Sequence, residues 1–296
     1  MITKPEVYSD EHLPRTLLHR EPAVETLTHA WAPTLEGQRG QDVLLHGPSG
    51  LAKTAPPRPR PRRLSVTPAA PVRCLGEPTG GILRGVLADL GADPVGNEPL
   101  EDLDLALRER VDSPVVVVLD EADGLPATDA LSRLLDVDLL SVVVICHDPD
   151  DWLARVDDRV RRAVAGHELG LDRYGVDELA DILEARARLG LPPSSVSREQ
   201  LEAIADEVAG VAREGIQSLR AAAELAGERG HSTIRDDDVQ DGFERARRFI
   251  RESNLQSLPI HHHVIYEIVR EWGPLGAGEL HDHYDDVAEA ALRGSD

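Results

Sequence analysis

The stretch DVLLHGPSGLAKT, residues 42–54, decides the fold, because a short apolar run leads directly into a glycine-rich loop. Gly47 to Thr54 matches the phosphate-binding pattern G-x-x-x-x-G-K-[ST] except at Ala52, which replaces the second glycine. In such a loop, backbone amides surround phosphate and the next helix adds the positive end of its dipole. The predicted phosphate-binding residues are Gly47, Pro48, Ser49, Gly50, Leu51, Ala52, Lys53 and Thr54.

Within this pattern, Lys53 is expected to reach the β- and γ-phosphates, and Thr54 to place its hydroxyl on Mg²⁺. Two features depart from it. Ala52 adds a methyl group where the backbone comes close to phosphate or adopts a positive φ. Four prolines at 56–61 occupy the first turns of the expected helix, where each interior proline costs roughly 3 kcal/mol. On the loop alone, a nucleotide site and a chance glycine-rich turn both remain open.

A second element, PVVVVLDEAD at 114–123, is an apolar run that ends in three acids. It predicts a buried strand of a parallel sheet, whose carboxyl end carries the chemistry. In a nucleotide site Asp120 would hold Mg²⁺ through its water shell, and Glu121 would position or activate the attacking water. A strand followed by an acidic turn is the alternative. The loop and the acidic strand in this order favour a nucleotide-binding ancestry.

The remaining patterns set the domain organisation. Another apolar run at 141–148 and amphipathic helical patterns among the strands indicate an α/β domain with a parallel sheet. From about residue 171 only helical patterns follow, which predicts a compact all-helical domain. The expected domains are a nucleotide-binding domain at 1–170, a helical lid at 171–255 and a third, small unit at 256–296.

Together these motifs resemble the AAA+ class of ATPases. In detail the chain resembles archaeal replication initiators related to the largest subunit of the origin recognition complex and to the cell-division-cycle loader protein. The resemblance implies a P-loop AAA+ parallel-sheet domain, an all-helical lid domain and a winged-helix domain. It covers nearly the whole chain, on VYSDEHLPRTLLHRE (7–21), VRCLGEPTGGILRGVLADLG (72–91), DEAD (120–123), RYGVDELADILEARA (173–187) and SLPIHHHVIYEIV (257–269).

The resemblance assigns further roles. The segment around Leu17, His19 and Arg20 would contact adenine. His147 falls on the first sensor, where the family usually has asparagine; a histidine there can still hydrogen-bond a γ-phosphate or a water. Arg213 falls on the second sensor, through which the lid would close over the phosphates.

Arg159 matches the arginine finger, which would act on the nucleotide of a neighbouring subunit. The alternative is that Arg159 belongs, with Arg161 and Arg162, to a solvated helix face. Both interpretations remain open.

The segment after 256 matches the start of the winged-helix domain. His261, His262 and His263 would lie on its first helix, where consecutive side chains point about 100° apart and do not converge on one metal ion. A winged helix needs about 80 residues. Residues 258–296 hold one helix and most of a second, so the domain is expected to be truncated, without its recognition helix and wing, and duplex binding to be weakened.

The proline-rich stretch at 55–72 shows neither helical nor strand periodicity. One interpretation is a basic polyproline segment that binds another protein or DNA. The other is a corrupted reading frame that is restored at about Cys74.

The composition predicts an acidic, soluble protein of the cell interior. Acidic residues number 54 against 32 basic ones, a net charge of −22 spread through periodic segments, which indicates a solvated surface of the halophilic kind. The Debye length is about 3 Å at 1 M salt, so this charge does not exclude DNA as a partner. Two cysteines give no disulfide framework, and neither a signal peptide nor a membrane span is evident, so a cytoplasmic location without membrane contact is expected.

The leading hypothesis is an ATP-binding initiator of DNA replication that recognises an origin and recruits the helicase. ATP or ADP and Mg²⁺ are the implied cofactors, and double-stranded origin DNA and the replicative helicase the implied partners. The alternative is a non-enzymatic, degenerate paralogue with lost or weak ATP hydrolysis and DNA binding. A chaperone-like or clamp-loader ATPase of the same class ranks lower.

Overall fold

The computed structural model describes residues 1–10, 12, 14, 16–48, 72–256, 258 and 260–293, with side chains up to residue 287. The chain divides into two units, Met1–Ile216 and Gln217–Asp296. The first contains the sheet and the second is described as helices.

In the described part of the chain, five strands form a parallel sheet in the order β2-β3-β4-β1-β5. This confirms the α/β class and the parallel sheet expected from the sequence. The three apolar runs form the three central strands. The edge strand β5 is short and only its middle residue is half-buried, so the sequence shows no apolar run there that would predict it. The strands are β1 Val43–His46, β2 Val72–Arg73, β3 Val115–Asp120, β4 Leu140–Cys146 and β5 Glu168–Gly170.

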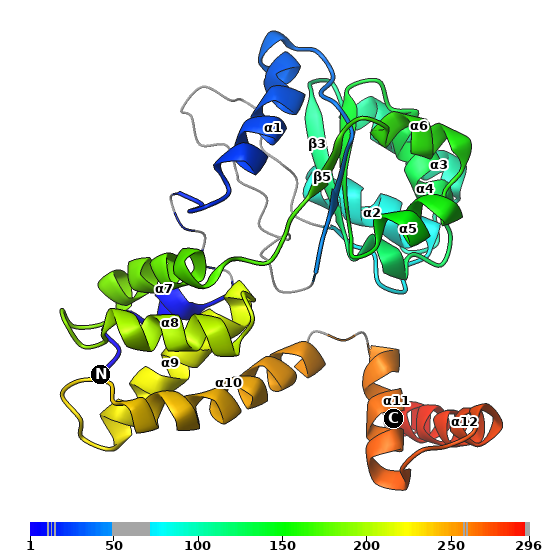
Figure 1. Cartoon of the computed structure of the whole chain (residues 1–296). Helices are drawn as coiled ribbons and strands as arrows, with labels where there is room; N and C mark the ends of the chain where they lie inside the picture. Colours follow the sequence, from blue (N-terminus) through cyan, green and yellow to red (C-terminus); the bar gives the residue numbers. More distant parts are fainter. Residues whose placement is uncertain are drawn as a thin grey trace. The chain divides into compact units, whose positions relative to one another are not determined.

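Helices cover both faces of the sheet (Figure 1). Successive side chains of a strand point to opposite faces. Val143 and Ile145 therefore pack against Trp31 of α1, while Val142 and Val144 belong to the core with the other helices. The helices are α1 Glu21–Trp31 on one face, and α2 Thr79–Asp89, α3 Leu100–Arg110, α4 Asp129–Leu135, α5 Pro149–Arg155 and α6 Asp158–Val164 on the other.

The first unit continues with α7 Val176–Gly190, α8 Arg198–Glu207 and the first turn of α9 Ala212–Glu228. The N-terminal segment, which includes the 3-10 helix η1 Pro5–Tyr8, lies against α7. Arg186 on α7 is buried and donates a hydrogen bond of 2.8 Å to the carbonyl of Val7. The start of the chain is thereby tied to helices that follow the sheet.

The second unit holds the rest of α9 together with α10 Asp236–Gln256, α11 Ile260–Trp272 and α12 Ala277–Arg293. The histidine run lies on α11, as the sequence predicts. Trp272 stacks on His283 of α12, with ring centroids 4.5 Å apart. An apolar groove of about 540 Å³, whose lining also includes Glu267, Glu271 and Asp286, lies between these two helices. Among the described residues, no helix has the length and apolar content needed to cross a membrane.

Candidate nucleotide site

The register of the sheet brings the predicted loop and the predicted acids to one edge. Leu44 of β1 and Leu119 of β3 both pair with Val144 of the strand between them. Asp120 ends β3 one residue beyond this level, and His46 ends β1 two residues beyond it. Because parallel strands share the same direction, the start of the phosphate-binding loop and the acidic strand end lie at the carboxyl edge of the sheet.

Asp120 is buried at this edge, with 7% of its surface exposed. Oδ1 of its carboxylate accepts a hydrogen bond of 2.9 Å from the amide of Glu121. Glu121 adopts a left-handed conformation with φ 56°, which is uncommon for a residue other than glycine and marks functional turns. The chain thus makes a sharp turn where the sequence predicts the magnesium-holding and water-activating carboxylates.

Burial, followed by the charges of Asp120, Glu121 and Glu77, raises the pKa of the Cys74 thiol to about 12. The amide of Cys74 donates a hydrogen bond of 2.8 Å to the carbonyl of Asp120. A protonated thiol is a poor nucleophile and a poor metal ligand. Cys74 therefore supports the position of Asp120 through its backbone and not through thiol chemistry.

His147 directly follows β4 and is held by the last acid of the DEAD motif. Its Nδ1 lies 2.8 Å from Oδ2 of Asp123, and its backbone amide donates to the same oxygen at 2.9 Å. Arg155 in turn donates to the backbone carbonyls of Asp123 and Leu125, the former at 2.6 Å. His147, the predicted first sensor, is thereby fixed to the acidic turn after β3. No individual role was predicted for Asp123 or Arg155: Asp123 belongs to the acidic end of the strand pattern, whereas Arg155, at the end of α5, carried no local signal.

The predicted phosphate-binding loop is described only at its start. Gly47 has φ 146°, and a Cβ atom there would lie 2.3 Å from the carbonyl oxygen of Leu171, so only glycine fits. Leu171 donates a backbone hydrogen bond of 2.8 Å to the carbonyl of His46. Pro48 follows Gly47. The other predicted loop residues, 49–54, and the proline-rich stretch lie outside the described residues and stay predictions.

The predicted adenine-contacting segment meets the connection between β5 and α7. The guanidinium carbon of Arg20 lies 3.8 Å from the centroid of the Tyr174 ring, a cation–π geometry. Arg20 also donates a hydrogen bond of 2.6 Å to the carbonyl of Asp172. His19, with φ 58°, bonds to Asp181 of α7. Leu17 is half-buried beside them in the chain. Tyr174 and Asp181 lie in the segment 173–187 that carries part of the family resemblance, but neither had a predicted role of its own.

The two remaining predicted arginines form ion pairs within the chain. Arg159 lies 2.5 Å from Asp136, and about half of its side chain is exposed. Arg213 makes two contacts with Oδ2 of Asp10, at 2.9 Å from Nε and 2.8 Å from Nη2. Asp10 belongs to the N-terminal segment, 203 positions away. The pairs leave the predicted roles as finger and second sensor untested, and either arginine would have to exchange a carboxylate for a phosphate to act.

The carboxylate chemistry at the sheet edge fits Mg²⁺, which prefers oxygen ligands and keeps several waters. Asp120 is the residue that would hold the ion, with Thr54 predicted as the other protein ligand. His231, Asp237 and Asp238 also cluster closely enough to bind a metal. Asp238, however, is buried and already accepts hydrogen bonds from His231, Arg229 and the amide of Arg235, so these contacts explain the cluster at the start of α10 without a metal.

Comparisons with known proteins agree with this architecture. The family model of the Cdc6 AAA+ ATPase-type lid domain matches residues 180–244. ORC1-type DNA replication protein 9 of Halobacterium salinarum is 33% identical over 294 residues, covering 96% of this chain and 83% of that protein. ORC1-type DNA replication protein 1 of the same organism is 29% identical, covering 96% of this chain and 95% of that protein.

Solved structures are similar over nearly the whole chain. The Aeropyrum pernix ORC1 protein in complex with DNA superposes with a TM-score of 0.76 at 24% identity, covering 98% of this chain and 82% of that one. The Aeropyrum pernix ORC2 protein in its ADPNP–ADP complexes gives 0.75 at 24% identity, covering 97% and 84%. These likenesses confirm the predicted AAA+ parallel-sheet fold with a helical lid.

Proposed function

The chain belongs to the archaeal family of ORC1-type DNA replication proteins, and from this premise we propose that it binds an adenine nucleotide with Mg²⁺ and takes part in initiating DNA replication. In this role it recognises origin DNA and recruits the replicative helicase. The relatives' names support the replication role, and the ADPNP–ADP complexes of a structural neighbour support the choice of nucleotide.

One observation carries the proposal: the carboxyl edge of the sheet. Three features lie together at this edge: the glycine turn at the end of β1, the left-handed Glu121 after β3, and His147 after β4, which bonds to Asp123. Parallel sheets bind ligands at this edge. Bound Mg²⁺ would neutralise phosphate charge, with Asp120 as its protein ligand.

Each predicted site residue has a separate role in this proposal. Lys53 binds the phosphates, Glu121 accepts the proton of the attacking water, and His147 hydrogen-bonds that water or the terminal phosphate. Arg213 leaves Asp10 for the phosphates when the lid closes, and hydrolysis reverses this exchange. The protein therefore acts as a nucleotide-dependent switch more than as a fast enzyme.

Nucleotide binding tests the proposal directly. The purified protein is assayed in molar potassium chloride for ADP that it retains and for ADP that it binds. Retained or added ADP is expected to be lost in Lys53→Ala, and Ala52→Gly is expected to bind it more tightly. Glu121→Gln should keep binding and lose hydrolysis. Tight binding that is undisturbed in Lys53→Ala would contradict the assignment of the site.

A non-enzymatic paralogue is the second candidate, favoured by the ion pairs of the predicted arginine finger and of the predicted second sensor. Arg159 is engaged by Asp136, and Arg213 by Asp10. If these pairs persist with nucleotide, the protein binds without turnover. Turnover that rises in Asp136→Asn and falls in Arg159→Ala would reject the paralogue; no measurable turnover in any of the three proteins would support it.

A further inference from the structure

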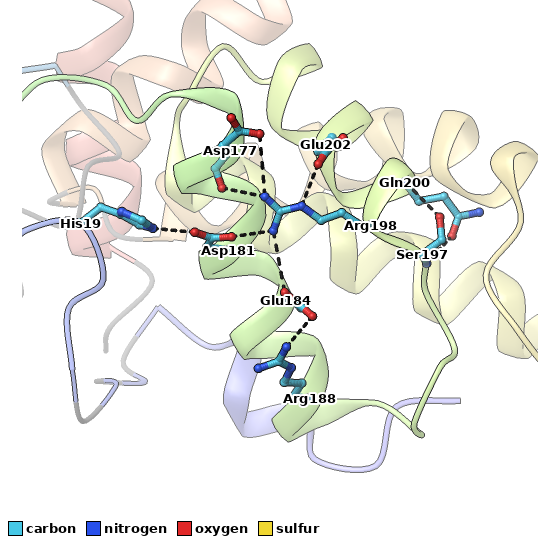
Figure 2. A network of polar contacts seen from close by, with 9 residues as sticks. All are labelled: His19, Asp177, Asp181, Glu184, Arg188, Ser197, Arg198, Gln200 and Glu202. Carbon is cyan, nitrogen blue, oxygen red and sulfur yellow. Dashed lines mark hydrogen bonds and ion pairs between the residues drawn. The ribbon is translucent and has the colours of Figure 1, made fainter.

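A network of charged side chains joins α7, α8 and the segment that precedes α1 (Figure 2). Arg198, the first residue of α8, is its centre, and we call it the Arg198 network. Arg198 donates from Nε to Glu202 at 2.7 Å and from Nη2 to the carbonyl of Asp177 at 3.1 Å. These contacts fix the guanidinium on the two helices. Its members are His19, Asp177, Asp181, Glu184, Arg188, Arg198 and Glu202; Figure 2 also draws Ser197 and Gln200, which cap the start of α8.

Asp181 bridges this centre to the N-terminal segment. Its Oδ1 accepts from Nη1 of Arg198 at 2.6 Å, and its Oδ2 accepts from Nε2 of His19 at 2.9 Å. The Arg198 guanidinium, and to a smaller extent the His19 ring, hold the pKa of Asp181 below its usual range. The carboxylate is therefore charged at neutral pH, with one oxygen for each partner, as a bridging group requires.

The bridge ends at a backbone conformation that needs support. His19 has φ 58°, a left-handed conformation that is strained for a residue other than glycine and persists only where its surroundings hold it. This turn directs the next residue, Arg20, onto the Tyr174 ring and the Asp172 carbonyl. Asp181 is the contact that holds the side chain of the strained residue.

We propose that Asp181 and Arg198 are positioning residues for the base of the bound nucleotide. Arg198 orients Asp181, Asp181 fixes the turn at His19, and this turn presents the segment up to Arg20 to the base. The inference rests on the proposed nucleotide binding, and it adds two lid residues to that site. Because the segment is held before the ligand arrives, binding does not have to order it.

The test separates base recognition from phosphate recognition. ADP and pyrophosphate are titrated against the whole protein in molar potassium chloride, for the wild type and for Asp181→Ala, Asp181→Asn and Arg198→Gln. In Asp181→Ala the Kd for ADP is expected to rise about tenfold, with that for pyrophosphate unchanged. Arg198→Gln should raise the Kd for ADP about threefold. Asp181→Asn keeps an acceptor for His19 and should restore most of the affinity.

Arg245→Gln is the matched control. It breaks an inter-helix ion pair with Glu228, at 2.7 and 2.9 Å, that lies outside the Arg198 network. This variant is expected to lower the Tm as Arg198→Gln does and to leave ADP affinity unchanged. If Arg198 acted only by stabilising the fold, the two variants would have the same effect on ADP affinity.

Two results would overturn the positioning role while leaving nucleotide binding intact. One is wild-type affinity for ADP in Asp181→Ala. The other is an equal loss for ADP and pyrophosphate, which would mean that the lid as a whole had loosened. A wild type that binds neither ligand would instead refute the proposed function, and the positioning role with it.

Discussion

Replacing Gly210 by alanine should destabilise the first unit strongly, because the residue lies against backbone. Gly210 has φ 78°, and a Cβ atom there would lie 2.1 Å from the carbonyl oxygen of Tyr174 and 3.1 Å from its carbonyl carbon. Tyr174 also donates a backbone hydrogen bond of 3.2 Å to the carbonyl of Gly210. An added methyl group has to push this backbone away, and with it the ring on which Arg20 stacks.

The magnitude follows from two contributions. The left-handed conformation costs alanine about 1 to 2 kcal/mol, partly offset by roughly 0.4 to 1 kcal/mol from the stiffer unfolded chain. Ordinary contact begins near 3.4 Å, so the Tyr174 carbonyl has to move by about 1.3 Å, which costs its hydrogen bond and packing roughly 2 kcal/mol. The total for Gly210→Ala is about 3 kcal/mol.

Gly37→Ala is the matched control for this variant. Gly37 has nearly the same φ, 76°, and nothing lies within 4 Å of its added Cβ. It should therefore cost only about 0.5 to 1 kcal/mol. Urea unfolding followed by circular dichroism measures both variants. Equal losses in the two would refute the reasoning, since the steric contribution from Tyr174 would then be absent.

Two further predictions concern acid stability and thiol reactivity. Asp238 is buried; burial raises its pKa, but hydrogen bonds from His231, the Arg235 amide and Arg229 outweigh this and hold the pKa below its usual range. The charged Asp238 therefore stabilises the folded state fully above about pH 4, and this stabilisation is lost as the pH falls through the lowered folded-state pKa. In Asp238→Asn the free energy of unfolding should depend less on pH in this acidic range, and an unchanged dependence would contradict the prediction. The buried thiols of Cys74 and Cys146 should resist maleimide at neutral pH until urea is added, and rapid native labelling would contradict their burial.

The sequence alone determined the fold class, because the signals that carry it are local. Apolar runs of four to seven residues became β1, β3 and β4, and amphipathic patterns became the helices on both sides of the sheet. Asp120 and Glu121 were predicted as site residues because the carboxyl ends of parallel strands carry the chemistry, whereas His147 was assigned only through the family resemblance.

Only the tertiary structure decided which side chains contact the other predicted site residues, Arg213, His19 and Arg20. Asp10 meets Arg213 across 203 positions, Asp181 meets His19 across 162, and Arg20 reaches the ring of Tyr174. No periodicity encodes such pairs, because they depend on where the N-terminal segment meets the helices that follow the sheet. Local hydrophobic spacing fixes the elements, whereas the ion pairs of the site exist only once distant elements have packed together.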